Sequence, residues 1–174
     1  MGRAAFKLND TNYHLTHLDP FSWVYVVPEK NGKPEQRYVI RVEFSCHCFT
    51  RARKDDHPPH LHYEEDGDLR TFCVERHAQS KTLKSHIQAL HAGTVFINQH
   101  KGARQNYMRI PIGSQNYEIY FILTRSNLSG VDLNLFVQSA FLRTHGAAAR
   151  MGKIKFMVAV HNTYHGKPIK AAPR

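Results

Sequence analysis

The chain has 174 residues, of which 41% are hydrophobic, and a formal net charge of +10. This length suits one domain over residues 1–174, and the hydrophobic content excludes wholesale disorder. No apolar run approaches the length that crosses a bilayer, and no apolar stretch follows Met1, so we expect neither a membrane protein nor a secreted one. The three cysteines do not make a disulfide framework, which favours a reducing, cytoplasmic setting.

The positive charge is distributed unevenly along the chain. Residues 1–76 hold 11 basic and 12 acidic residues, whereas residues 77–174 hold 13 basic and 2 acidic residues, Glu118 and Asp132. Because the second stretch is rich in strand-forming residues, we expect its charge on a folded face rather than on a tail. Such a face favours a polyanion partner, in the first place nucleic acid. The alternative is a basic protein whose charge serves only solubility.

The N-terminal part is predicted to begin with a polar arm over residues 1–20 and to continue as a β-hairpin over residues 21–50. The first strand of the hairpin is rich in aromatic and β-branched residues. The Asn31-Gly32 pair predicts the turn. The second strand, residues 37–50, alternates between apolar and polar side chains, which predicts one buried and one exposed face.

One helix is predicted, over residues 78–92, after an irregular stretch at residues 51–70. Ser80 is the candidate N-cap of this helix, and Gly93 is the stop signal. The apolar residues that recur at helical spacing are Leu83, Ile87 and Leu90.

After the helix the pattern changes to the two-residue period of strands. Short polar or small-residue connections separate these strands, which predicts an antiparallel meander. We therefore expect an α+β fold in which a dominant antiparallel sheet packs on one helix over residues 78–163. The predicted strands are residues 94–98, 106–112, 117–125, 131–143 and 153–163.

Alternation along the predicted C-terminal strands gathers polar side chains on one face of the sheet. RNA cleavage without a metal uses the 2′-hydroxyl as nucleophile and needs a base and an acid. Glu118 and His161 are the candidates for these two roles. The solvated outer face of a sheet would show the same alternation, and that alternative stays open. The residues of this predicted face are Glu118, Tyr120, Thr124, Asn134, Gln138, Lys155 and His161.

The same face is predicted to bind the nucleic acid. Lys155, Arg109 and Lys153 are the candidates for neutralising negative charge on a phosphate. Tyr120 and Phe136 are the candidates for stacking on a base.

A second acid–base cluster is predicted near the end of the hairpin. His47 lies on the polar face of its strand, in line with Glu43, and Arg51 follows shortly after. The alternative is a histidine that only satisfies a neighbouring carbonyl or carboxylate. At the start of the predicted helix, Arg76 and Lys81 are further candidates for phosphate binding, and an ordinary capped helix is the alternative.

Cysteine and histidine residues cluster in the first half of the chain, which raises zinc as an alternative cofactor. The candidate ligands are Cys46, Cys48, His60 and His62. Their spacing matches no closed zinc finger, and both cysteines continue the apolar face of their strand. We therefore expect core cysteines and no cofactor.

Several runs resemble a bacterial family labelled stationary phase growth adaptation protein. Residues 44–51 (Phe-Ser-Cys-His-Cys-Phe-Thr-Arg) resemble its Phe-Ser-x-His-x-Phe-Thr-Arg run. The other similar runs are residues 72–76, 80–81, 137–141 and 154–170. At the level of the fold, a helix followed by an antiparallel sheet is similar to the RelE/barnase-like ribonuclease toxins. That resemblance implies cleavage without metal by residues on the sheet.

The sequence thus predicts a toxin-like bacterial endoribonuclease that acts on RNA and is held in check by an acidic inhibitor protein. The first alternative is a non-catalytic module that binds nucleic acid or an acidic protein. The second alternative is a zinc-binding protein.

Overall fold

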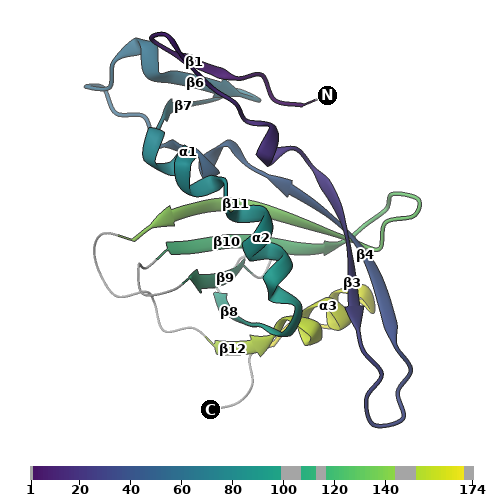
Figure 1. The fold of residues 1–174 in the computed structure, drawn as a ribbon. Coiled ribbons are helices and arrows are strands. Elements are labelled where there is room, and N and C mark those ends of the chain that lie inside the picture. Colours follow the sequence, from purple (N-terminus) through teal and green to yellow (C-terminus); the bar gives the residue numbers. More distant parts are fainter. Residues whose placement is uncertain (1, 99–106, 113–116, 144–151, 171–174) are drawn as a thin grey trace.

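The fold is seen in a computed structural model, which describes residues 2–98, 107–112, 117–143 and 152–170 (Figure 1). The α-helices are α1 (Val74–Ser80), α2 (Leu83–Gln88) and α3 (Phe156–Tyr164). Short 3₁₀ turns are η1 (Thr16–Leu18), η2 (Cys46–Cys48), η3 (Pro59–Leu61) and η4 (Ala89–Ala92). The strands are β1 (Phe6–Leu8), β2 (Thr11–Tyr13), β3 (Phe21–Val27), β4 (Gln36–Phe44), β5 (Thr50–Arg51), β6 (His62–Glu65), β7 (Asp68–Phe72), β8 (Thr94–Asn98), β9 (Tyr107–Ile112), β10 (Tyr117–Arg125), β11 (Leu133–Leu142) and β12 (Gly152–Lys155).

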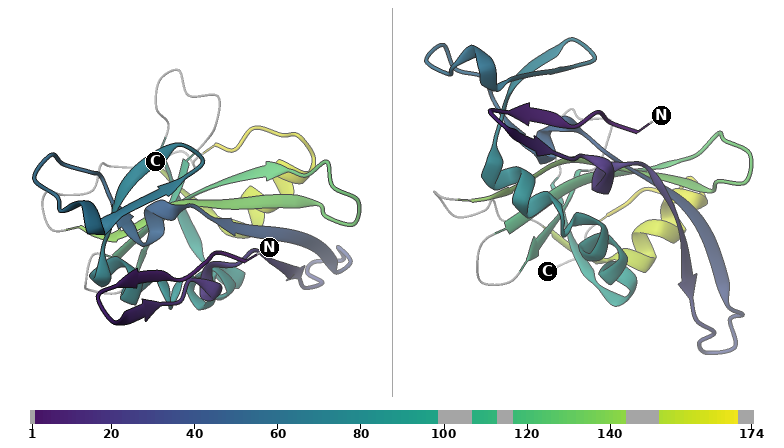
Figure 2. Two further views of the ribbon diagram at one scale, coloured as in Figure 1. Left: turned by 90° about the horizontal axis from the view of Figure 1, so that it is seen from above. Right: turned by 45° about the horizontal axis from the view of Figure 1, so that its top comes forward.

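A seven-stranded sheet in the order β12-β8-β9-β10-β11-β4-β3 dominates the described part of the chain. Strands β8 to β11 form the antiparallel meander, and β3 pairs with β4 as a hairpin, so the predicted α+β class is confirmed. The sequence did not indicate how the two parts join: β4 lies parallel to β11 and makes one continuous sheet. A three-stranded sheet, β5-β7-β6, and the β1–β2 hairpin lie at one end of this sheet (Figures 1 and 2).

One face of the large sheet carries the core, and helices cover it. Phe121 of β10 and Phe156 of α3 have ring centroids 6.1 Å apart, so α3 covers the face to which Phe121 points. His86 of α2 contacts Tyr117, which alternation places on the same face as Phe121. Both helices therefore lie on the same side of the sheet, as the views in Figures 1 and 2 show. One cluster of buried residues runs from Leu15 through the sheet to Ile169.

The predicted helix over residues 78–92 is divided into α1, α2 and η4, and its apolar residues Leu83, Ile87 and Leu90 are buried as expected. Ser80 is not an N-cap: it is the last residue of α1, and its hydroxyl donates to the carbonyl of His77 over 2.7 Å. This local hydrogen bond competes with helix continuation, which agrees with the break after Ser80. None of the helices in the described part of the chain has the length and apolar character needed to cross a bilayer.

The predicted strand over residues 153–163 is wrong for most of its length. Only its first residues belong to β12, and α3 follows from Phe156. The apolar residues suit both periods, but the buried set is Phe156, Ala159 and Val160, which has helical spacing. Val158, which the strand pattern placed beside Phe156, is 39% exposed.

The predicted strand over residues 37–50 ends at Phe44. The Ser45 hydroxyl accepts a hydrogen bond from the backbone N–H of His47 over 3.1 Å and caps η2, which turns the chain away from the sheet. Cys46 and Cys48 are buried, as expected of core cysteines. The N-terminal arm is more regular than predicted, because it contains the β1–β2 hairpin.

Candidate functional site

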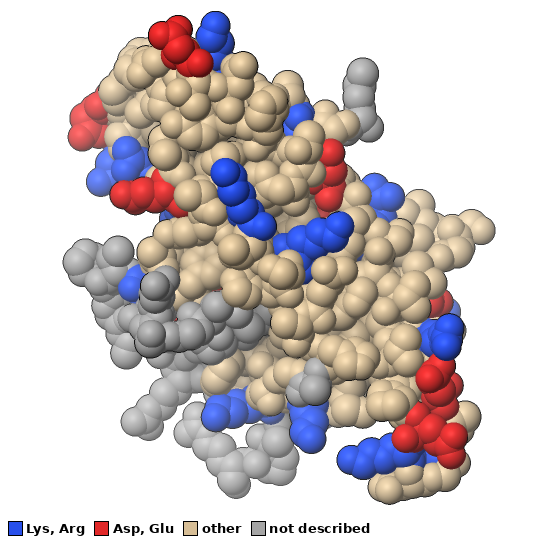
Figure 3. Space-filling model, viewed as in Figure 1, with Lys and Arg blue, Asp and Glu red and all other residues tan. Residues whose placement is uncertain are grey.

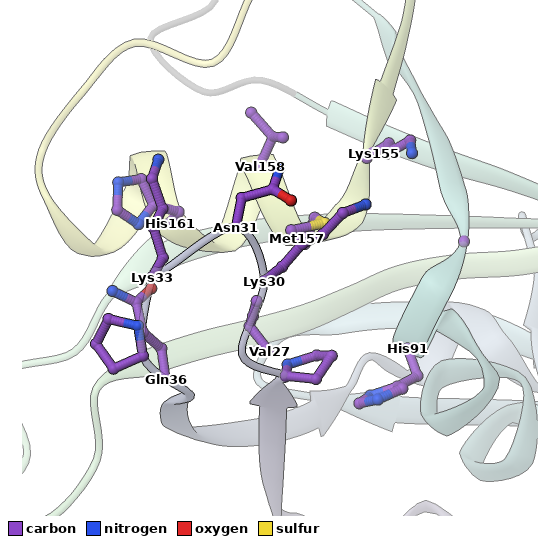
Figure 4. A pocket seen from close by; sticks show the side chains of 13 residues that line it. Val27, Lys30, Asn31, Lys33, Gln36, His91, Lys155, Met157, Val158 and His161 are labelled. Atoms are coloured by element: carbon purple, nitrogen blue, oxygen red, sulfur yellow. The ribbon is translucent and has the colours of Figure 1, made fainter.

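A pocket with a volume of about 540 Å³ lies between the turn that joins β3 to β4 and the first half of α3 (Figure 4). Its charged and titratable lining comprises three lysines and two histidines, and no Asp or Glu is among the described residues that line it. These five residues are Lys30, Lys33, His91, Lys155 and His161. Lys155 and His161 were predicted to share a site, and the structure brings both to this pocket.

The turn at the pocket places two lysines opposite each other. Asn31 and Gly32 both have positive φ angles, 53° and 72°, which is the geometry of a type I′ hairpin turn. Lys30 and Lys33 flank these residues and exchange both backbone hydrogen bonds, at 3.1 and 3.0 Å. Like charges directly opposite each other in a hairpin repel, so an anion bound near both ammonium groups would reduce this repulsion.

His161 is held by a short hydrogen-bond chain from β4. The Tyr38 hydroxyl donates to Oε1 of Gln36 over 2.8 Å, and its oxygen lies 3.3 Å from Nδ1 of His161. Because the tyrosine proton is directed to Gln36, this network assigns the His161 proton to Nδ1 and leaves the lone pair on Nε2. His161 lines the pocket with a neutral ring that can accept a proton.

Burial and neighbouring positive charge keep His161 neutral. Its pKa lies below the usual histidine value, first because of burial and then because of His165, Lys167 and Lys33. The rings of His161 and His165 have centroids 4.4 Å apart. A neutral imidazole at pH 7 suits a general base.

The N-terminus of α3 also faces this pocket. Lys155 is its N-cap and makes no side-chain cap hydrogen bond, and the first-turn residues Met157 and Val158 line the pocket. The first N–H groups of a helix have no partner within the helix and carry partial positive charge. This end of α3 therefore adds to the positive field of the lysines.

Glu118 does not belong to this pocket, and its predicted pairing with His161 is wrong. Alternation along β10 places Glu118 on the opposite face from Phe121, and α3, which carries His161, covers the Phe121 face. Glu118 is buried and accepts hydrogen bonds from Arg143 over 2.6 Å and from the Tyr120 hydroxyl over 2.5 Å. Glu118 therefore has a structural partner in Arg143.

The predicted nucleic-acid residues are dispersed rather than gathered. Tyr120 stacks on Phe141, and the ammonium group of Lys153 lies over the ring of Phe96. Phe136, on β11, is 39% exposed, on the sheet face that α3 does not cover. Arg109 is on β9 opposite Tyr120, and its side chain lies outside the described residues.

The predicted phosphate site of Arg76 and Lys81 stays a prediction, and the structure gives Arg76 backbone partners. The Arg76 guanidinium donates to the carbonyls of His47 and Thr50, over 3.2 and 2.7 Å, and so ties α1 to η2 and β5. Lys81 lies after the end of α1 and directly before Thr82, the N-cap of the six-residue helix α2. Lys81 lines a second pocket, between α1 and the segment from β2 to η1, together with His14, His17 and His77.

The predicted basic face stays a prediction. In Figure 3, Lys and Arg are spread over the visible side of the molecule, with Asp and Glu beside them at both ends. Lys101, Arg104, Arg150 and Arg174, which contribute to the basic C-terminal half of the sequence, lie outside the described residues.

His47, the centre of the second predicted cluster, contacts other residues than those predicted. Nε2 of His47 lies 2.7 Å from a carboxylate oxygen of Asp68, not near Glu43, which pairs with Arg41. Arg51 is exposed at β5. The thiol of Cys46 completes a group of three ligand atoms that all lie within 4.8 Å of one another. A Cys–His–Asp cluster able to hold a metal ion is therefore present.

The other predicted zinc ligands do not join this group. Cys48 is fully buried with its thiol toward the carbonyl of Val137, and burial raises its pKa to about 12. His60 is exposed on η3, and His62 begins β6. Within the described ranges the potential metal cluster consists of Cys46, His47 and Asp68 alone.

Sequence reasoning missed several residues of these sites. Asn31-Gly32 was identified as a turn, and a type I′ turn would have placed its two flanking lysines opposite each other. No local signal marks the others, because they meet their partners through contacts between distant segments. The missed residues are Lys30, Lys33, Asp68, His91 and Arg143.

Comparisons with known proteins place the chain in a family. The model of the YjaZ family matches residues 5–164, which include every strand and helix that forms the pocket. No curated protein and no solved structure matched the chain. The protein therefore belongs to the YjaZ family.

Proposed function

We propose that the protein cleaves RNA without a metal ion, in the pocket between the β3–β4 turn and α3. The observation that carries this proposal is the setting of His161. It is a neutral histidine with its proton on the side of Tyr38, and it lines a pocket with three lysines. Phosphodiester cleavage requires such a proton acceptor beside groups that stabilise a negatively charged phosphate.

The reaction follows from the chemistry of RNA. Nε2 of His161 takes the proton of a 2′-hydroxyl, and the resulting oxygen attacks the adjacent phosphorus. The bond to the 5′-oxygen breaks, and that oxygen receives a proton from a general acid. His91, which also lines the pocket, fills this role in our proposal in place of Glu118. Lys30, Lys33 and Lys155 stabilise the charge that develops on the phosphate. The products carry a 2′,3′-cyclic phosphate and a 5′-hydroxyl.

The test is incubation of the purified protein with total RNA in EDTA, followed by chemical mapping of the new ends. We expect cyclic phosphate ends with the wild type and a loss of about 10²-fold or more in rate for His161→Gln. His60→Gln, which alters an exposed histidine outside the pocket, is the matched control and should cleave normally. Equal rates for His161→Gln and the wild type would exclude this site.

A non-catalytic role is the alternative result of the same experiment. RNA that binds in a salt-sensitive manner and stays intact would support a binding module. In either case we propose a cytoplasmic protein, and an acidic inhibitor whose carboxylates engage the lysines of the pocket. Such a complex would block the RNA site and dissociate as salt is raised.

A second candidate function, zinc binding, is favoured by the Cys46–His47–Asp68 cluster. Thiolate, imidazole and carboxylate are all zinc ligands, and three protein ligands leave a fourth position for water. Two features oppose it: Arg70 lies 3.6 Å from the Asp68 carboxylate, and burial raises the pKa of the Cys46 thiol. Metal analysis of the purified protein decides whether zinc is bound. Stoichiometric zinc that is lost in Cys46→Ser and retained in Cys73→Ser would establish the site.

A further inference from the structure

The pocket at the β3–β4 turn has two chemically distinct parts. Lys30, Lys33 and Lys155 supply positive charge, whereas its apolar lining comes from Val27, Pro28, Pro34, Met157 and Val158. In Figure 4 the turn carrying Lys30 and Asn31 faces the α3 side chains Met157, Val158 and His161. A ligand that fills this space must therefore combine a flat or apolar body with an anionic group.

The acids of the same turn do not cancel this charge inside the pocket. Glu29 and Glu35 are exposed and are not among the residues that line it. Glu35 accepts a hydrogen bond from Arg37 over 2.8 Å, so it is already paired. The lysines thus share the pocket with two histidines and, among the described lining residues, with no acidic side chain.

The volume limits the size of the ligand. About 540 Å³ is within the range of sites that enclose one small organic ligand. It is too small for a folded oligonucleotide and larger than a lone phosphate requires. A single base with its sugar and phosphate suits both the volume and the division into apolar and cationic parts.

We propose that this pocket binds one nucleoside monophosphate unit, with its phosphate between Lys30 and Lys33 and its base against Met157 and Val158. The inference rests on the proposed function, since it names the part of an RNA chain that the site holds. The Asn31 side-chain amide, which can donate and accept hydrogen bonds, is the pocket group best suited to contact a base edge. The pocket would then read one nucleotide and leave the rest of the strand in solvent.

The first test is a calorimetric titration of the full-length protein with AMP and UMP, with adenosine and uridine, and with inorganic phosphate. We expect the monophosphates to bind at least tenfold more tightly than either the nucleosides or phosphate, because only they use both parts of the pocket. Equal affinity for phosphate would reduce the site to a simple anion site. Equal affinity for the nucleosides would show that the lysines do not contribute to binding. Either result, or no binding by any of the ligands, would overturn the proposal.

The second test uses lysine variants. Lys30→Ala and Lys33→Ala should each weaken monophosphate binding about tenfold, because each removes one charged partner of the phosphate. Lys7→Ala, which removes an exposed lysine of β1 outside the pocket, is the matched control and should bind normally. If all three variants bind like the wild type, the phosphate is not held at the turn and the proposal fails.

The outcome is separable from that of the proposed function. Monophosphate binding without RNA cleavage would reject the cleavage proposal and leave the nucleotide pocket intact. Conversely, RNA cleavage that depends on His161 in a protein that binds no monophosphate would retain the reaction and reject the pocket.

Discussion

Nδ1 of His161 lies 3.3 Å from the phenolic oxygen of Tyr38, which joins helix α3 to strand β4 across 123 residues of sequence. The tyrosine ring is buried and packs edge-on against Tyr164, one turn further along α3. The large sheet therefore fixes both the position of α3 and the side of the histidine ring that carries the proton.

Replacing Tyr38 by Phe tests this arrangement. The ring keeps its packing but no longer accepts the proton of His161 Nδ1, so the histidine is less well oriented. We expect RNA cleavage to slow by about tenfold, RNA affinity to stay constant, and stability to fall by about 1 kcal/mol. Single-turnover kinetics separate the first two quantities. Tyr63→Phe is the matched control, because its hydroxyl contacts Glu65 far from the pocket lining. A normal rate in Tyr38→Phe would show that the contact does not orient the base.

Glu118 is expected to matter for stability rather than for catalysis. Removing one member of a buried ion pair leaves the other charge without compensation, which costs about 3–5 kcal/mol when both are buried. Arg143 is partly exposed, so we expect about 2–3 kcal/mol for Glu118→Ala in urea denaturation. Glu43→Ala breaks the exposed pair with Arg41 and should cost less than about 1 kcal/mol.

The cleavage rate of Glu118→Ala distinguishes the two roles. At a temperature where the variant is folded, it should match the wild type per folded molecule. A complete loss of cleavage in a folded Glu118→Ala protein would return this residue to the active site.

The charge pattern marked Glu118 as unusual, and the structure shows a structural contact for it that the pattern did not indicate. The two acids of the basic half both serve the sheet: Glu118 pairs with Arg143, and Asp132 accepts a hydrogen bond from the backbone N–H of Val39 over 2.7 Å. Which residue they meet depends on the parallel contact of β4 with β11 and on the end of β11, and neither has a local signal.

The strand predictions are confirmed where the sequence shows a clear two-residue period. They are wrong where the apolar positions fit the period of a strand and that of a helix equally well. Strands 117–125 and 131–143 alternate over many residues, and the structure confirms them within a few residues at the ends. In residues 154–160 the apolar positions fit both a strand and a short helix, and β-branched residues favoured the strand. The packing of Phe156 against Trp23, Tyr25 and Phe121 selects the helix, and no sequence pattern contains that information.

Stability is expected to fall as the pH falls from about 7 to 5. Burial comes first among the causes that lower the pKa values of His17, His86 and His161. Below the usual histidine pKa of about 6.5 the unfolded chain binds these protons while the folded chain does not. The unfolded state then gains free energy from protonation, so stability decreases as pH decreases.

Urea midpoints at pH 7, 6 and 5 measure this slope. His17→Gln, His86→Gln and His161→Gln should each make this slope shallower. Asp68 and Glu65 affect stability at lower pH. The pKa values of both carboxylates are lowered, so their contribution to stability is lost only as the pH falls through the carboxylate range. Midpoints that are constant from pH 7 to 5 would contradict the assignment of neutral histidines.

Two glycine turns, at Gly32 and Gly67, provide a matched pair of sites for testing the geometry of the pocket. Gly32 in the β3–β4 turn and Gly67 in the β6–β7 turn have φ angles of +72° and +81°, and each follows a residue with positive φ. Neither glycine has an atom within 4 Å of an added Cβ, so the cost of an alanine is conformational at both. We expect Gly32→Ala and Gly67→Ala each to lower stability by about 1 kcal/mol.

Their effects on ligand binding should differ. A strained β3–β4 turn changes the relative positions of Lys30 and Lys33, so Gly32→Ala should weaken binding of a nucleoside monophosphate several-fold. Gly67→Ala imposes the same strain on a turn outside the pocket and should bind normally. Because both variants lose similar stability, a difference in calorimetric affinity between them reports on the lysine pair itself. Equal affinities would mean that the backbone of this turn does not set the geometry of the site.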